Sequence, residues 1–549
     1  MEKKITTSAV DPTTHSDDAA SVEAGIFVAT EYAGEQPSGS ANQLHRTFTS
    51  RHIQMIGLAG SIGSGLFIGT GKALRYGNYP GMFLGWTLIC TQQWMQMQVM
   101  SEACVIFPTS GAFIDHAARF LDPALAFALG ACEWFAWHTT LAAEGAVFRL
   151  ILTYWTTEIP TAACMTFYLA VVFAIHCLPN RWFAEVEFGT AVLKMFMMFI
   201  IIITCIVMLA GGGPTGTTHH AENYTDLPAF PNGFKGIAQC FLLASFSCGG
   251  NELLGITNGE AKMPRWNMPR AINNLAARLF FFFGVSVVFI SLLVPYTDER
   301  LLGPSNIAAS PFVIAMSDAG IKGLPDLLNV VIIIGLCAIG AESLYITSRL
   351  GTAMARMGLF PKSFGHVDKK GRPYVSLAFS AGLAIILTYI NCSNTGGVIF
   401  TWFSSVGSPV YFIAYLVVAA TNWRMRAAFK AQNDNPLTLK YAYKNKAYPL
   451  GSVFLFISGV FVLASTFYIS LYPINQPMGA DTFFQTFLCI PLFLTLWIGY
   501  KVICKTKWVD PAKADLQSGR RPLTAEDIAF LDAYYSQPMY KRIFSYVGL

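Results

Sequence analysis

The sequence predicts an all-α membrane protein of about twelve transmembrane helices, arranged as a 5+5 inverted repeat with two extra helices. Three observations lead to this prediction. Charged residues make up 13% of the chain, about half the soluble-protein average of roughly 25%. Apolar segments of about 20 residues, each long enough to cross a hydrocarbon core of about 30 Å, recur along the sequence. The first and the sixth of these segments are interrupted by glycine and polar residues.

The predicted elements form one membrane domain, about 51–503, between two polar tails. Residues 1–50 are rich in Ser, Thr, Ala, Asp and Glu without periodic apolar spacing, which predicts a disordered tail. Residues 504–549 form the second tail. The expected first repeat covers about 53–211, the second about 236–420, and the two extra spans about 451–503. The twelve expected spans are 53–73, 82–104, 124–150, 161–178, 189–211, 236–257, 276–295, 327–353, 375–391, 397–420, 451–472 and 482–503.

The distribution of Lys and Arg predicts the orientation of these spans. The loops after spans 6, 8 and 10 are rich in Lys and Arg, whereas the loops after spans 9 and 11 have none. Because such loops stay on the cytosolic side, both tails are expected in the cytosol. The sequence Asn223-Tyr224-Thr225 is a glycosylation acceptor in the loop after span 5, which this topology places outside.

Several classes of protein are excluded. The composition is not that of a disordered chain, a secreted disulfide scaffold or a nucleic-acid binder. The twelve cysteines include no CxxC pair, and neither a metal site nor a cofactor motif is visible. An enzyme is not expected, because the loops show no nucleophile and base pair. The sequence carries no signal for an oligomeric state.

The first span contains five glycines in the twelve residues from Gly60 to Gly71. Since each glycine costs a helix roughly 1 kcal/mol relative to alanine, we expect an unwound segment that binds a ligand. Close helix packing through Gly65 and Gly69 is the alternative. The pattern fits neither a phosphate-binding loop nor a dinucleotide fingerprint.

The sixth span repeats this interruption between Phe246 and Leu253, where a Gly-Gly-Asn-Glu run stands inside an apolar helix. Breaks at corresponding positions of two five-helix halves indicate an inverted-repeat transporter with its substrate site at the midplane. Backbone N–H groups freed in the first span would bind a carboxylate, and freed carbonyls in both breaks would bind an ammonium group. Such a site suits a zwitterion.

Four sequence blocks carry a family resemblance. They are RHIQMIGLAGSIGSGLFIGTG, FPTSGAFIDHAARFLDPALAFALG, NELLGITNGEAKMPRWNMPRAI and SLYITSRLGTAMARMGLFPKSFGHVDKKGRPYVS. Over about positions 45 to 520 the chain resembles the fungal amino-acid permeases of the amino acid–polyamine–organocation superfamily. The resemblance implies a twelve-span fold of the bacterial leucine-transporter type, a plasma-membrane location, and amino-acid uptake driven by the proton gradient.

The resemblance also implies roles for individual residues. Lys194, which follows the Glu185-Val186-Glu187-Phe188 motif, matches an amine that proton-coupled relatives place where sodium-coupled members bind their cation. A lysine reaching the cytosolic interface is the alternative. Glu252 matches the acid of span 6, and Glu144 an acid near the substrate and proton site. The implied substrate-binding residues are Ile62, Gly63, Ser64, Gly65, Phe246, Ser247 and Gly250.

Two acidic residues depart from the family pattern. Glu133 lies eleven residues before Glu144 on the same face of span 3, and we interpret it as a step in a proton path or as an attraction for a cationic substrate. Glu342 stands where a small polar residue is usual, and could pair with Lys194, attract a basic group, or stay protonated in the bundle. Trp137 is interpreted as a packing or interface residue.

The sequence therefore predicts a proton-coupled amino-acid permease that works by alternating access in the lipid bilayer. Its partners would be an amino acid or related amine and protons. Two alternatives stay open: a carrier of cationic amines such as polyamines or carnitine-like compounds, and an amino-acid sensor with a permease fold.

Overall fold

The computed structural model describes residues 63–218, 221–251, 253–257, 264–301, 310–368, 371–393, 396–539 and 542. The predicted N-terminal tail, Ile62 and Glu252 lie outside the described residues. The described part of the chain is helical and contains no strand. Its helices are η1 (Gly65–Gly69), α3 (Thr70–Ile106), α4 (Ala112–Phe120), α5 (Pro123–Leu152), α6 (Thr161–Cys177), α7 (Asn180–Leu209), α8 (Glu222–Thr225), α9 (Gly233–Cys248), α10 (Leu253–Thr257), α11 (Pro264–Leu279), η3 (Phe280–Gly284), α12 (Val285–Leu293), η4 (Glu299–Leu301), α13 (Pro311–Asp318), α14 (Leu324–Arg356), η5 (Lys362–Gly365), α15 (Tyr374–Ile390), α16 (Gly396–Ala431), η6 (Pro436–Thr438), α17 (Leu450–Leu471), α18 (Ala480–Phe487), α19 (Cys489–Cys504), η7 (Pro511–Lys513) and α20 (Ala525–Tyr535).

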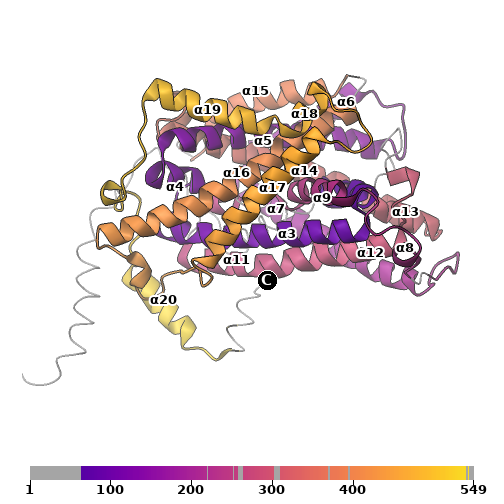
Figure 1. Cartoon of the computed structure of the whole chain (residues 1–549), viewed down its shortest axis with the longest axis horizontal. Helices are drawn as coiled ribbons and strands as arrows, with labels where there is room; N and C mark the ends of the chain where they lie inside the picture. The colour runs from indigo at the N-terminus through magenta and orange to yellow at the C-terminus, as the bar shows by residue number, and fades with distance from the viewer. Residues whose placement is uncertain are drawn as a thin grey trace, which may run out of the picture.

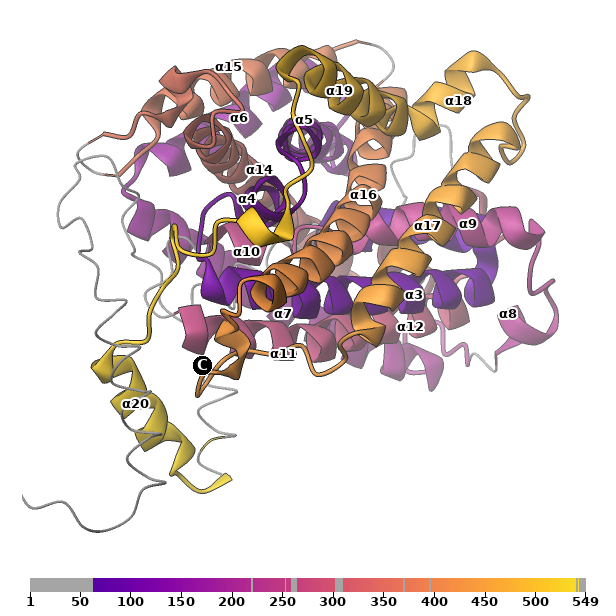
Figure 2. The ribbon, with the colours of Figure 1, turned by 60° about the vertical axis from the view of Figure 1, so that its left-hand side comes forward.

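Long helices form a single bundle in which α5 and α14 pack side by side (Figure 2). Around them lie α6, α15, α16 and α19. Helix α3 packs along α9 on another side of the bundle. The short helix α8 and the C-terminal helix α20 lie at opposite ends of the molecule (Figure 1). The bundle thus has two distinct ends, as a membrane-spanning domain requires.

Four helical stretches are long and apolar enough to cross a membrane: 182–209, 268–293, 324–356 and 450–471. The pair α18 and α19, bent by 67° at Leu488, makes a fifth candidate. In α14, 78% of the most apolar window is buried, against 33% in α7, so α14 is an interior helix and α7 presents apolar side chains outward. Over their described residues, the other expected spans also coincide with helices, but the count of twelve stays a prediction.

The connection between the first two expected spans lies inside the expected gap between residues 73 and 82 but is shorter than that gap. A helix was expected to end at about residue 73 and the next to begin at 82, yet helical structure runs from Thr70 to Ile106. The interruption is at Asn78, whose φ of 51° and ψ of −170° are not helical. Asn tolerates positive φ better than most residues, and Pro80 lacks the N–H that a continuous helix would need. The first span therefore turns directly into the second.

Glu102, near the end of α3, is fully buried and joins α3 to α16. It forms a salt bridge with Arg426 and accepts hydrogen bonds from Asn422 Nδ2 at 2.8 Å and from the Asn445 backbone N–H at 2.6 Å. Charge-assisted bonds of this kind are strong because the carboxylate is shielded from water. The carboxylate thus holds together two helices and the loop before α17.

The segment after α19 docks on the end of the bundle where α3, α4 and α16 end and α11 begins. Val509 N–H donates to the carbonyl of Leu121 at 2.7 Å, and Arg521 N–H to that of Ile106 at 3.1 Å. The Trp266 ring of α11 packs edge to face against two rings of α20, with centroid distances of 5.1 and 4.1 Å. The predicted C-terminal tail is therefore folded against the transmembrane bundle over much of its length.

Candidate functional site

The break predicted in span 6 is present between α9 and α10. Helix α9 ends at Cys248, and Gly249 is extended with a φ of −60° and a ψ of 173°. Gly250 has a φ of +92°, a conformation that glycine adopts without the clash that a Cβ atom would cause. Helix α10 begins three residues later. The two glycines therefore end one half-helix and redirect the chain into the other.

The glycine-rich turn of span 1 lies directly against this break. A Cβ atom built on Gly65 would lie 2.4 Å from Ser247 Cα, and one on Gly69 would lie 3.2 Å from Ser247 Oγ. Non-bonded carbon atoms are in ordinary contact at about 3.5–4.0 Å. Only a residue without a side chain allows the two backbones to approach this closely at position 65. The structure thus brings the two predicted interruptions into contact.

The expectation of an unwound segment is wrong for the described part of span 1. Residues Gly65–Gly69 form a π-helical turn, and the α-helix follows from Thr70. The N–H groups of Leu66 and Phe67 both donate to the carbonyl of Gly63, at 3.1 and 3.2 Å. A wound turn satisfies its own backbone hydrogen bonds, which apolar surroundings require. The glycines of this turn therefore serve the close approach of the two backbones.

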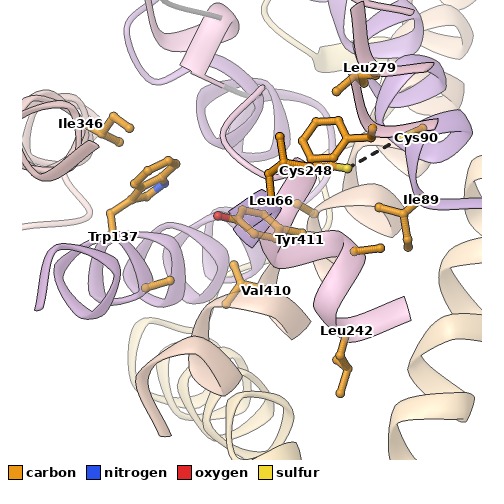
Figure 3. Packing of buried hydrophobic residues seen from close by; sticks show 14 of the residues in the cluster. Leu66, Ile89, Cys90, Trp137, Leu242, Cys248, Leu279, Ile346, Val410 and Tyr411 are labelled. Atoms are coloured by element: carbon orange, nitrogen blue, oxygen red, sulfur yellow. Dashed lines mark hydrogen bonds between the residues drawn. The ribbon is translucent and has the colours of Figure 1, made fainter. Parts of the chain in front are cut away.

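A small cavity of about 30 Å³ lies where the two interrupted helices meet. Its walls come from the start of η1, the end of α9 and the helices α5, α14 and α16. Figure 3 shows the Tyr411 ring beside Cys248 and Leu66 at this junction. The lining residues are Gly63, Ser64, Gly65, Trp137, Thr140, Glu144, Phe246, Ser247, Gly249, Ile339 and Tyr411.

Glu144 connects the cavity to the first turn of η1. Ser64 Oγ donates a hydrogen bond of 2.6 Å to Glu144 Oε1, and both residues are buried. Glu144 Oε2 is buried without a hydrogen-bond partner among the described residues. Buried carboxylate oxygens are nearly always hydrogen-bonded, so this oxygen is an acceptor that a bound ammonium group could use.

Lys194 lies next to this site with its side chain 2% exposed, which contradicts the alternative of a lysine reaching the interface. A Cβ atom on Gly335 of α14 would lie 2.8 Å from Lys194 Cε, so the amine stem packs against a helix that has no side chain there. The carboxyl groups of Glu187, Glu342 and Glu144 are all close enough to act electrostatically on the amine. Helices α5, α7 and α14 thus contribute to one buried charged cluster.

Glu133 and Glu342 do not line the cavity. Glu133 is buried, and its electrostatic neighbour in α19 is Cys489. It is therefore separated from the Lys194 cluster along the same helix. Glu342 belongs to that cluster, as the sequence had predicted for one of its possible roles.

The remaining predicted residues have the following places. Phe246 and Ser247 line the cavity, whereas Gly250 forms the adjoining turn. Asn223 is half-buried, and its Nδ2 donates to the carbonyls of Ser291 and Leu292 at 3.2 and 2.9 Å. The nitrogen that would carry a glycan is thus engaged in this structure, and glycosylation at Asn223 stays a prediction.

Sequence reasoning missed several residues of this region. Trp137 was interpreted as a packing residue, yet with Thr140 and Glu144 it forms a stripe at i, i+3 and i+7, which places all three on one helix face. That spacing could have identified it. Ile339 and Tyr411 carry no such signal, because only the folding of α14 and α16 brings them to the cavity.

The family model described as Amino acid permease matches residues 52–511. The chain belongs to the amino acid permease family. As a member of this family, the permease is 35% identical to the amino-acid permease GAP5 of Candida albicans over 493 residues, covering 89% of this chain and 79% of that protein. It is 32% identical to the general amino-acid permease GAP1 of Saccharomyces cerevisiae, covering 90% and 85%, and 32% identical to the tryptophan permease of the same yeast, covering 93% and 88%. These relatives are named as transporters and not as enzymes.

A solved structure gives an independent view of the permease fold. The manganese transporter of Eremococcus coleocola superimposes with a TM-score of 0.50 at 13% sequence identity, covering 85% of this chain and 98% of that one. At this identity the likeness concerns the fold alone, which is of the leucine-transporter type. The permease is therefore a membrane protein with a transporter fold, and its described residues form helices without a strand.

Proposed function

We propose that this permease takes up amino acids across the plasma membrane by proton symport, with alternating access and with both termini in the cytosol. Family membership and the transporter fold support the general activity. Twelve spans, in two five-helix repeats and two extra helices, fit the helices that coincide with the expected segments. The Lys- and Arg-rich loops support the orientation.

The substrate would bind where the two interrupted helices meet. Its carboxylate would accept hydrogen bonds from the N–H groups at the start of η1, around Gly63, Ser64 and Gly65, where the helix dipole favours an anion. Its ammonium group would donate to Glu144 Oε2 and to carbonyl oxygens at the end of α9. Ile62 and Glu252 are proposed to belong to the same region on the family resemblance alone.

The hydrogen bond between Ser64 and Glu144 is the observation that carries the proposed coupling, because it joins the substrate-binding turn to the charged cluster around Lys194. A proton that enters this cluster neutralises one carboxylate or charges the amine. Either change alters the field at Glu144, since charges interact strongly when they are shielded from water. The protonation state of the cluster would then bias the binding turn between its outward and inward arrangements.

Glu187 would be the additional member of this proton site. It lies seven residues before Lys194 on α7, two turns along the same helix face, and it is fully buried. Glu133, about three turns along α5 from Glu144, is retained as a proposed step on the proton route to the cluster.

Uptake of a labelled amino acid by the Lys194→Met variant tests the proposal. We expect the variant to lose the acceleration of uptake at acidic external pH and its sensitivity to a proton uncoupler. Lys322→Met, at an exposed lysine between α13 and α14, is the matched control and should keep both. Fully pH-dependent uptake by Lys194→Met would refute the coupling role, and binding without uptake by the wild-type chain would favour a sensor.

A further inference from the structure

The cavity wall is divided into a polar part and an apolar part. The polar part is made by Gly63, Ser64 and Glu144 together with Ser247. The hydroxyl hydrogens of both serines are already used, because Ser64 donates to Glu144 and Ser247 donates to the carbonyl of Leu243 at 2.7 Å. These serines can therefore only accept further hydrogen bonds, which suits an ammonium group beside them.

The opposite part of the cavity wall is apolar. It consists of the side chains of Trp137, Phe246, Ile339 and Tyr411, each from a different helix. Thr140 also lies there, and its hydroxyl hydrogen is already used in a bond to the carbonyl of Ala136 at 3.0 Å. Two of the apolar side chains touch the backbone of the interrupted helices. A Cβ atom on Gly63 would lie 2.2 Å from Ile339 Cδ1, and one on Gly249 would lie 2.6 Å from the Tyr411 ring.

The acidic charge of the described cavity wall lies on its polar side. Among the described residues that line the cavity, Glu144 is the acidic side chain, and it stands beside the polar wall. The two acids that could have attracted a cationic side chain, Glu133 and Glu342, lie beside Cys489 and Lys194 instead. A lysine or arginine side chain bound against the apolar wall would thus bury a second charge with no acidic partner there among the described residues, which is costly.

We propose that this site selects neutral amino acids with apolar side chains. The side chain of the bound amino acid packs against Trp137, Ile339 and Tyr411, and Glu342 does not contribute to the selectivity. The proposal rests on the proposed function of amino-acid transport and adds the substrate class to it. Backbone groups and Glu144 hold the part that all amino acids share, and the four apolar side chains hold the part that differs.

The two large rings also set the upper size of the side chain. A cavity of about 30 Å³ has room for about two water molecules, so the walls must move apart when an amino acid enters. Trp137 and Tyr411 are the bulkiest side chains on the apolar wall, and their helices, α5 and α16, pack against each other. Replacing Trp137 by a smaller residue should therefore allow larger substrates to bind.

Separate uptake assays with labelled leucine and labelled lysine test the proposal in cells that express the full chain. We expect kcat/KM for leucine to exceed that for lysine by roughly 100-fold, within the range that an unfavourable pocket contact produces. Unlabelled phenylalanine should compete with leucine, whereas arginine, choline and carnitine should not. Equal uptake of lysine, or competition by the quaternary amines through an aromatic cage, would overturn the proposal. Uptake of neither label by chain present at the cell surface would instead refute the proposed function.

Three variants locate the selectivity. Trp137→Ala should raise uptake of tryptophan relative to leucine by roughly tenfold, whereas Trp182→Ala, at an exposed tryptophan of α7, should leave the ratio unchanged. Glu342→Gln can lower transport, but the ratio of leucine to lysine should stay as in the wild type. A shift of the ratio of leucine to lysine in Glu342→Gln would contradict the assignment. So would the same ratio of tryptophan to leucine in both tryptophan variants.

Discussion

The contact between the two interrupted helices predicts a graded response to the addition of single methyl groups. Replacing Gly65 by alanine places a Cβ atom 2.4 Å from Ser247 Cα. Ordinary contact between carbon atoms begins near 3.5 Å, so the two backbones must separate by about 1 Å. Neither atom can swing aside, because one is a main-chain atom and the other is fixed to the main chain.

The expected cost follows from this displacement. Overpacking of a well-packed interior costs about 1–3 kcal/mol in stability, and a 1 Å misplacement of binding groups can reduce the rate about 100-fold. We therefore expect Gly65→Ala to reach the membrane in reduced amounts and to lose about 100-fold in uptake per molecule. Gly69→Ala, whose Cβ would lie 3.2 Å from the movable Ser247 Oγ, should lose less than about tenfold.

Uptake of a labelled amino acid, divided by the amount of protein at the cell surface, measures the effect. Gly382→Ala in α15 is the matched control, because a Cβ atom there meets no atom within 4 Å. That variant should transport normally, and its stability should rise slightly, since alanine favours a helix by up to about 1 kcal/mol over glycine. Wild-type uptake by Gly65→Ala, or equal losses in all three variants, would refute the reasoning.

Two further predictions concern the end of the bundle where the C-terminal segment docks. Glu102→Gln should lower stability by about 3 kcal/mol, because Arg426 would lose its buried counter-charge. A shift of the melting temperature in detergent checks this. A double variant with Arg426→Gln that loses the sum of both single effects would contradict the pairing. Burial lowers the pKa of His116 in α4 to about 4, against the charge of Asp115, which raises it. Because the unfolded chain binds this proton near pH 6.5, stability should fall as the pH drops from 6.5 to 4, by about 3 kcal/mol in total. The variant His116→Gln, which can keep the bond to the carbonyl of Phe107, should flatten the dependence of melting temperature on pH. An unchanged dependence in this variant would show that other groups cause it.

The sequence was informative where a local rule was broken. Glycines at 249 and 250 in an apolar helix predicted a break, and the structure has one there, because their conformations suit residues without a side chain. The glycines of span 1 were equally visible, but their effect was misjudged. Composition shows that such a turn is a poor α-helix, yet it does not tell an unwound segment from a π-helical turn that makes room for Ser247.

For the charged residues, too, the sequence identified the unusual positions but misjudged some of their neighbours. Sequence pattern and family resemblance together identified Glu144, Lys194 and Glu342 as exceptions in apolar helices, and the structure brings all three into one cluster. They also paired Glu133 with Glu144, because both lie on one face of α5. A long helix passes several neighbours, so residues eleven positions apart share a face without sharing a neighbour, and Glu133 faces α19 instead.

By itself, the sequence indicated a helical membrane protein with irregular first and sixth spans, since apolar length, scarce charge and helix-breaking residues are local properties, and the resemblance of its sequence blocks indicated the amino-acid permease type. Only the tertiary structure decided which side chains share the cavity. Ile339, Tyr411 and Trp137 come from three helices far apart in the sequence, and their meeting depends on how α5, α14 and α16 pack. The proposed substrate class follows from that packing, because selectivity depends on what surrounds the bound side chain in space.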